Sequence, residues 1–261
     1  AFRFPFEHRA GSAVLNKASR IACRLGRYEE AWGHYKMLTS VYIVPALNKD
    51  LLLAQADTCL SRNDFTEAEK WVATYLYYFP VDTARAEGLY RLFKIKQMEG
   101  AQQAELVTIG LSAMQADVTH PLIMPTLMET ARIMEDLGLY STAALYYNRL
   151  ALLGFVGSTN TPTTFLRMDS IHPAILGKAR CFLKAGEVIK ADRLLREICR
   201  NRGETSSLQS EAAYWWATIA VENGQGREAL RRLDLIESGS LTSNLAVRAE
   251  IDRQIAVVLT G

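Results

Sequence analysis

Apolar and small residues recur along this chain with the spacing of amphipathic helices, and five segments share one further pattern. In each segment a turn-forming Gly or Asn is followed five positions later by an alanine. Large apolar residues stand four and seven positions after that alanine, on the same face of a helix. The five sets are Gly26/Ala31/Tyr35/Leu38, Asn63/Ala68/Val72/Tyr75, Gly138/Ala143/Tyr147/Leu150, Gly186/Ala191/Leu195/Ile198 and Gly224/Ala229/Leu233/Ile236.

This spacing predicts hairpins of two helices. Gly or Asn accepts the positive φ that ends the first helix and begins a tight turn. The alanine then allows the second helix to approach the first closely, and the two large apolar residues lie on the same face as the alanine. Five matches to one pattern are difficult to explain by composition alone.

The five segments resemble tetratricopeptide repeats (TPRs). The pattern of that family also has a small residue seven positions before the turn, and this chain has Ser19, Ala56, Ala131, Ala179 and Ala217 at those positions. The resemblance implies an all-α, right-handed superhelical solenoid of about six helix-turn-helix repeats, in a single domain over residues 1–261. It implies little about function, because the same scaffold serves many partners.

The chain also departs from the family pattern, whose period is about 34 residues. The long interval between the turns at Asn63 and Gly138 predicts a further, degenerate hairpin with its turn near Glu99–Gly100. We expect an N-terminal extension over residues 1–12 and an inter-repeat insertion over residues 154–173. A helix over residues 241–260 is expected to cap the array, since an uncapped solenoid exposes its last apolar face.

Charge and composition argue against several classes of protein. The chain has 30 basic and 28 acidic residues, a net charge of +2, which is too balanced for a general nucleic-acid binder. No apolar run approaches the roughly 20 residues that span a bilayer, so membrane insertion is not expected. The four cysteines are scattered and form no CxxC pair, which favours a reducing compartment such as the cytoplasm.

No combination of residues indicates an enzyme. The four histidines are far apart and form no HExxH motif, and neither a phosphate-binding GxxxxGK[ST] loop nor a GxSxG motif is present. The carboxylate pairs Glu29–Glu30 and Glu135–Asp136 lie near predicted turns, where solvated charges are common. We therefore expect no catalytic site, no metal and no cofactor.

In the TPR family the first helices of the hairpins line a concave groove. Alignment of the repeats to that family predicts a partner-binding set of Asn16, Arg20, Arg24, Asp57, Met128, Arg132, Arg180, Lys184 and Tyr214. Arginine recurs at one groove position in three repeats, and such a basic row would suit an acidic peptide or a carboxylate terminus. The alternative is that these arginines pair with groove acids such as Asp57 and Glu135.

The function favoured by these observations is a non-catalytic scaffold or adaptor that binds a protein or peptide within a multiprotein assembly. One alternative is a self-associating assembly module, in which the apolar N-terminal segment docks on another copy. Another alternative is a regulatory repeat domain of a larger protein.

Overall fold

The structure is a computed structural model, and it describes residues 5–41, 45–80, 82–116, 122–156, 164–200 and 206–260. Within these residues it contains thirteen α-helices and no β-strand. The chain divides into two compact units, Ala1–Thr126 and Leu127–Gly261. The single repeat domain over residues 1–261 stays a prediction.

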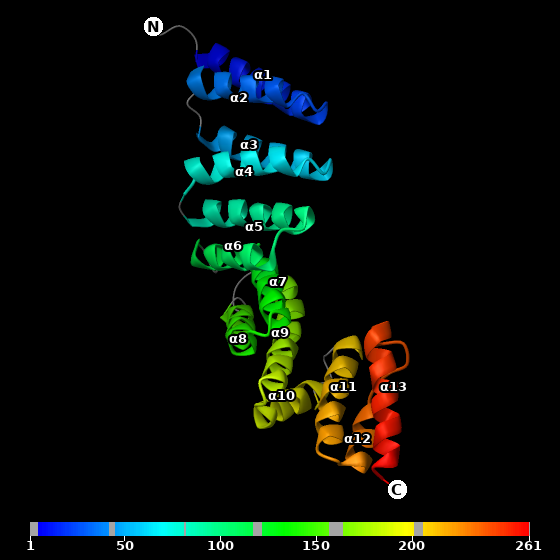
Figure 1. The fold of residues 1–261 in the computed structure, drawn as a ribbon. Coiled ribbons are helices and arrows are strands. Elements are labelled where there is room, and N and C mark those ends of the chain that lie inside the picture. The colour runs from blue at the N-terminus through cyan, green and yellow to red at the C-terminus, as the bar shows by residue number, and fades with distance from the viewer. Residues whose placement is uncertain are drawn as a thin grey trace. The chain divides into compact units, whose positions relative to one another are not determined.

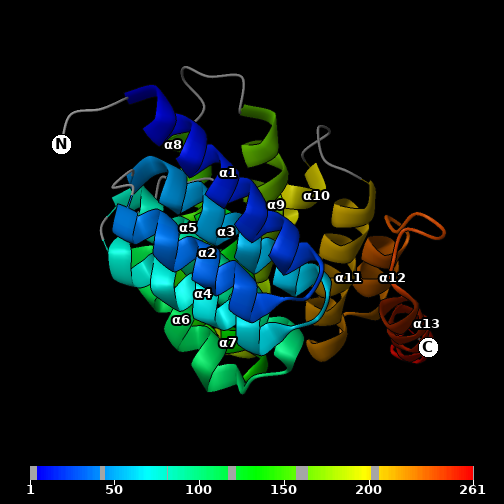
Figure 2. The ribbon, with the colours of Figure 1, turned by 90° about the horizontal axis from the view of Figure 1, so that it is seen from above.

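The N-terminal unit is a stack of three helix hairpins. Helix α1 packs on α2, α3 on α4 and α5 on α6, and α4 packs in turn on α5 (Figure 1). In Figure 2 the same helices are seen from above, one behind another and running in a similar direction. Their bounds are α1 (Pro5–Arg24), α2 (Tyr28–Val41), α3 (Pro45–Ser61), α4 (Phe65–Tyr78), α5 (Asp82–Glu99) and α6 (Gln103–Ala116).

The C-terminal unit continues the same alternation of helices, and the division between the units falls within α7. From α8 onward each helix packs on the next one along the chain, and α13 contacts both α11 and α12. The bounds are α7 (Ile123–Asp136), α8 (Tyr140–Val156), α9 (Thr164–Lys184), α10 (Val188–Arg200), α11 (Ser206–Glu222), α12 (Gly226–Leu233) and α13 (Ser243–Val258).

One kind of turn ends the first helix of every hairpin. At Gly26, where φ is 76°, the N–H of Arg27 donates to the carbonyl of Ala22 at 2.9 Å, and the N–H of Gly26 donates to that of Cys23 at 3.0 Å. This pair of bonds is the Schellman motif, which satisfies the last carbonyls of the helix. The same two bonds and a positive φ occur at Asn63, Gly100, Gly138, Gly186 and Gly224. The five predicted turns and the degenerate turn at Gly100 are thus confirmed.

An alanine follows each of the five predicted turns, and it is fully buried between the helices of the hairpin. All five pattern alanines are 0% exposed: Ala31, Ala68, Ala143, Ala191 and Ala229. The small residues predicted in the first helices are also buried, none more than 1% exposed: Ser19, Ala56, Ala131, Ala179 and Ala217. Because a larger side chain would hold the helices apart, these positions decide the spacing within each hairpin.

Aromatic side chains fill the core of the N-terminal unit. The ring of Trp71 is fully buried and stacks on Trp32 with a centroid distance of 3.5 Å and an interplanar angle of 2°. Tyr35 meets both indoles edge-on. These rings belong to α2 and α4, so they join the second helices of two successive hairpins.

The structure changes two of the expected segment boundaries. Helix α1 begins at Pro5, so most of the expected extension over residues 1–12 belongs to the first helix. In the expected insertion over residues 154–173, α8 runs to Val156, and α9 begins at Thr164 and contains Pro173 in its interior. Residues 157–163 lie outside the described part of the chain.

Helix α13 forms where the terminal helix was predicted, and its exposed side carries several apolar residues. Ala256 is fully buried in a small cluster with Ala220 of α11 and Ala229 of α12. Apolar residues spaced along the other side of α13 are exposed: Val247, Ile251, Ile255 and Val258. Exposed polar residues, Arg248, Glu250 and Gln254, stand between them, so the exposed side of α13 is mixed.

None of the helices in the described part of the chain has the length and apolar character needed to span a membrane.

The close packing of α8 on α9 gives a test of the fold. A Cβ added at Gly177 of α9 would lie 2.5 Å from Cζ of the buried Tyr147 ring, whereas one added at Gly33 of α2 would meet nothing within 4 Å. We expect Gly177→Ala to lower the free energy of unfolding by about 1–3 kcal/mol. Gly33→Ala should raise it by about 0.5–1 kcal/mol, because alanine favours the helix. Urea denaturation measures both, and effects of the same sign would contradict this packing.

Candidate functional site

The predicted partner-binding residues all lie on first helices of hairpins, but they belong to two separate units. The N-terminal unit holds Asn16, Arg20 and Arg24 on α1 and Asp57 on α3. The C-terminal unit holds Met128 and Arg132 on α7, Arg180 and Lys184 on α9, and Tyr214 on α11. Their surroundings differ sharply between the units.

On α1, the predicted residues form a row with one helical turn between members. Arg24 is exposed, and Asn16 and Arg20 are half-buried. The Nε atom of Arg20 is buried and has no hydrogen-bond partner. Neither Arg20 nor Arg24 forms an ion pair with any side chain that the structure describes. This row therefore carries two positive charges that no described side chain neutralises.

Asp57, one of the groove acids with which the arginines could pair, has another partner. Arg91 of α5 donates from Nε to Oδ1 of Asp57 at 2.9 Å and from Nη2 to Oδ2 at 3.1 Å. Such bidentate pairing is the geometry in which arginine binds a carboxylate best. The carboxylate of Asp57 is thus paired with an arginine of the next hairpin. Arg91 was not predicted, although it follows Asp57 by 34 residues, about one repeat period.

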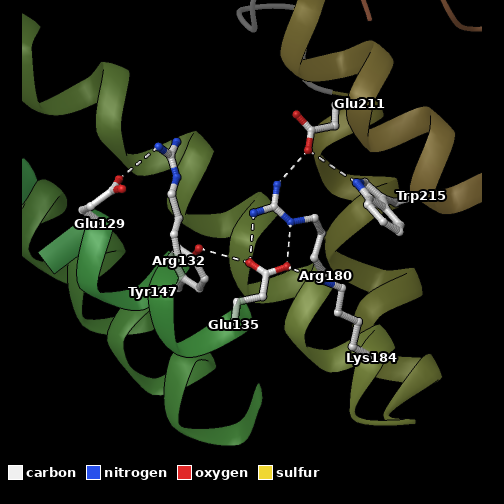
Figure 3. Close-up of polar contacts among 8 residues, drawn as sticks. All are labelled: Glu129, Arg132, Glu135, Tyr147, Arg180, Lys184, Glu211 and Trp215. Carbon is white, nitrogen blue, oxygen red and sulfur yellow. Dashed lines mark hydrogen bonds and ion pairs between the residues drawn. The ribbon is translucent and has the colours of Figure 1, made fainter. Parts of the chain in front are cut away.

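In the C-terminal unit, Glu135 of α7 is the centre of a buried polar network (Figure 3). Its side chain is 5% exposed. Arg180 donates to it from Nε at 3.2 Å and from Nη2 at 3.0 Å, and Lys184 donates from Nζ at 2.9 Å. The hydroxyl of Tyr147 donates to the same carboxylate at 3.2 Å. Three helices, α7, α8 and α9, therefore meet at one negative charge.

A second carboxylate extends the network to α11. Nη1 of Arg180 donates to Oε1 of Glu211 at 2.7 Å, and Nε1 of Trp215 donates to the same oxygen at 3.4 Å (Figure 3). The guanidinium of Arg180 is thus held between two acids on different helices. The arrangement satisfies both carboxylates with donors from neighbouring repeats.

The electrostatics of the network follow from this geometry. Burial acts to raise the pKa of the Glu135 carboxyl, but the hydrogen bonds and charges of Arg180 and Lys184 outweigh it and hold that pKa below its usual 4.5. Burial also raises the pKa of the Tyr147 hydroxyl, and the negative charge of Glu135 raises it further. Glu135 is therefore ionised, and Tyr147 is a neutral donor at neutral pH.

The predicted basic row is only partly available to a partner. The alternative that arginines pair with groove acids is correct for Arg180, which binds Glu135, and Lys184 binds the same acid. Arg132 is exposed and pairs with Glu129 of its own helix, at 3.5 Å. Tyr214 is 4% exposed, so the prediction that it lines an accessible groove is wrong.

Among the side chains that the structure describes, no group of three or more His, Cys, Asp or Glu residues could hold a metal ion.

No protein-family model and no curated protein matches the chain. Among solved structures, the TPR domain of P58(IPK) is similar, with 12% identity and a TM-score of 0.37. The likeness covers 95% of this chain and 65% of that chain. At this TM-score the likeness carries no weight of its own, and the helix-pair assignment depends on the turns and buried alanines above.

The network around Glu135 predicts a large loss of stability on its removal. Glu135→Ala removes the acid that Arg180 and Lys184 share and leaves Arg180 with Glu211 alone, so it should lower the free energy of unfolding by about 1–3 kcal/mol. The exposed neighbour Asp136 forms no ion pair with the described side chains, so Asp136→Ala should change it by no more than about 0.5 kcal/mol. Urea denaturation followed by circular dichroism measures both variants. Equal effects would show that the network contributes nothing specific.

The lowered pKa of Glu135 also predicts a dependence on pH. A carboxyl whose pKa is lower when folded than when unfolded stabilises the protein above its unfolded value, and this contribution disappears as pH falls through the folded pKa. Wild-type protein should therefore lose stability from about pH 4.5 downward. Glu135→Gln should be less stable at neutral pH and should lose less on acidification. Parallel curves for the two proteins between pH 6 and pH 3 would contradict the assignment.

Proposed function

We propose that this chain is a non-catalytic helical-repeat scaffold that binds a protein or peptide partner in a multiprotein assembly. The supporting observation is that the same turn ends the first helix of each hairpin, and that small residues at equivalent positions of the hairpins are buried. Repetition of a single packing unit builds an extended surface rather than a single enclosed pocket. A right-handed superhelical solenoid of about six repeats is part of this proposal.

The proposed contact for the partner is the row Asn16, Arg20 and Arg24 on α1. The two arginines keep their charge unpaired among the described residues, and Nε of Arg20 is an unused donor. A half-buried guanidinium without a counter-ion gains most from a carboxylate, because that ligand supplies two acceptors at once. An acidic peptide segment is therefore the partner chemistry that this row fits.

Arg132 and Met128 on α7 form a second, smaller candidate contact in the C-terminal unit. Arg132 is exposed, and Met128 beside it on the helix is half-buried. Arg180 and Lys184 are not proposed as contacts, because a partner would have to displace Glu135 from a buried network. Fewer basic residues are therefore proposed as partner contacts than the repeat alignment predicts.

Affinity capture from native extract, with mass spectrometry of the bound proteins, tests the α1 row. The double variant Arg20→Gln/Arg24→Gln should bind the captured partner about 10- to 100-fold more weakly than wild type, the worth of one or two charge-assisted hydrogen bonds. The matched control is Arg193→Gln/Arg200→Gln, which removes two exposed arginines of α10 that form no ion pair with the described side chains.

The outcomes of this capture separate the candidate functions. Loss of the partner with the α1 variant alone supports the row, and equal binding by both variants rejects it. Capture of the chain itself as the main bound species would favour self-association instead. Circular dichroism and thermal melting of each variant confirm that the fold is intact.

A further inference from the structure

Cys23 and Cys59 face each other in the core of the N-terminal unit. Cys23 lies near the end of α1 and Cys59 near the end of α3, and both are 0% exposed. Their Sγ atoms are 3.6 Å apart and share a hydrogen bond. The thiol of Cys23 also lies 3.8 Å from the carbonyl oxygen of Gln55. The two sulfurs are thus in direct contact with no other group between them.

A second contact, one helical turn away, fixes this pair in register. Nε2 of Gln55 donates to Oγ of Ser19 at 2.8 Å, and Ser19 donates in turn to the carbonyl of Ala31 at 2.9 Å. Ser19 and Gln55 each precede the cysteine of their own helix by four residues. Two successive turns of α1 and α3 therefore touch, and neither helix can slide without breaking a buried hydrogen bond.

We propose that Cys23 and Cys59 form a reversible intramolecular disulfide when the protein meets a peroxide, and that this bond ties α1 to α3. The sulfurs need to approach by about 1.6 Å to reach the length of a disulfide. Helix α1 also carries Arg20 and Arg24, so the bond would fix the helix that holds the proposed partner contact. The inference about the cysteines does not depend on that contact.

The chemistry needs only a small uncharged oxidant. Cys23 Sγ, as a thiolate, attacks one oxygen of hydrogen peroxide, the O–O bond breaks, and a sulfenic acid and one water form. Cys59 Sγ then attacks the Cys23 sulfur, and the sulfenic oxygen leaves with a proton as the second water. Two thiols and one peroxide thus give one disulfide and two waters, and a thiol reductant reverses the change.

The surroundings assign different roles to the two sulfurs. The hydrogen bond with Cys59 lowers the pKa of the Cys23 thiol, although burial acts to raise it. The same hydrogen bond, together with burial, raises the pKa of Cys59. In the proposal Cys23 is the thiol that reacts first and Cys59 is the resolving thiol, and dimedone labelling of the Cys59 variants tests this order. Because both are buried, the reaction proceeds at the rate at which the core opens to peroxide.

The test uses the full chain, fully reduced and then exposed to hydrogen peroxide under native conditions. Remaining thiols are blocked with N-ethylmaleimide, and tryptic peptides are analysed without reduction. We expect the peptide of residues 21–24, which holds Cys23, to be linked to that of residues 50–62, which holds Cys59. The oxidised protein should melt about 5 °C or more above the reduced protein. Dithiothreitol should remove both the link and the shift.

The chain supplies its own controls. Cys181→Ser/Cys199→Ser removes the other two cysteines and should leave the link and the shift unchanged. Cys59→Ser should abolish the link and leave Cys23 as a sulfenic acid that dimedone labels, because its hydroxyl can still donate to Cys23. Cys59→Ala should abolish the link too, and without that donor Cys23 should be labelled more weakly. The proposal is overturned if no Cys23–Cys59 link forms under native conditions. It is equally overturned if links to Cys181 or Cys199 form as readily, or if the link appears only after addition of urea.

Discussion

The close approach of paired helices at small residues is the constraint on which the rest of this structure depends. Five alanines with no exposed surface lie where second helices meet first helices. Each is placed by a turn whose two backbone hydrogen bonds end the first helix at a fixed distance. Turn and alanine thus act together, since the turn sets the register and the alanine sets the separation. Large apolar side chains then fill the space that remains.

The sequence predicts those features that short-range spacing determines. The positive φ at Gly26 and Asn63 follows from residue types that tolerate it, and the buried alanines follow at a constant offset. Even the degenerate hairpin with its turn at Gly100 could be located, because the interval between clear turns required it. Each prediction concerns residues within one helical hairpin, where sequence distance and spatial distance agree.

Sequence spacing does not determine which distant polar groups pair. The repeat alignment treats Arg20, Arg132 and Arg180 as equivalent, but only Arg180 faces a buried acid from a neighbouring hairpin. That acid, Glu135, is 45 residues away, and its ion pair depends on rotamers and burial that a single sequence does not specify. For the same reason the prediction for Tyr214 was wrong: its position in the repeat was correct, but its side chain is buried.

The network around Glu135 has a consequence for how related sequences can change. One carboxylate serves Arg180, Lys184 and Tyr147, so no partner can be exchanged without leaving the others with an altered charge balance. Substitutions at these positions should therefore occur together, with acid and bases lost as a group and replaced by apolar residues. The solvated charges on outer faces of the same helices are free to vary one at a time. In sequences related to this chain, surface residues would then change one at a time, whereas Glu135 and its partners would change together.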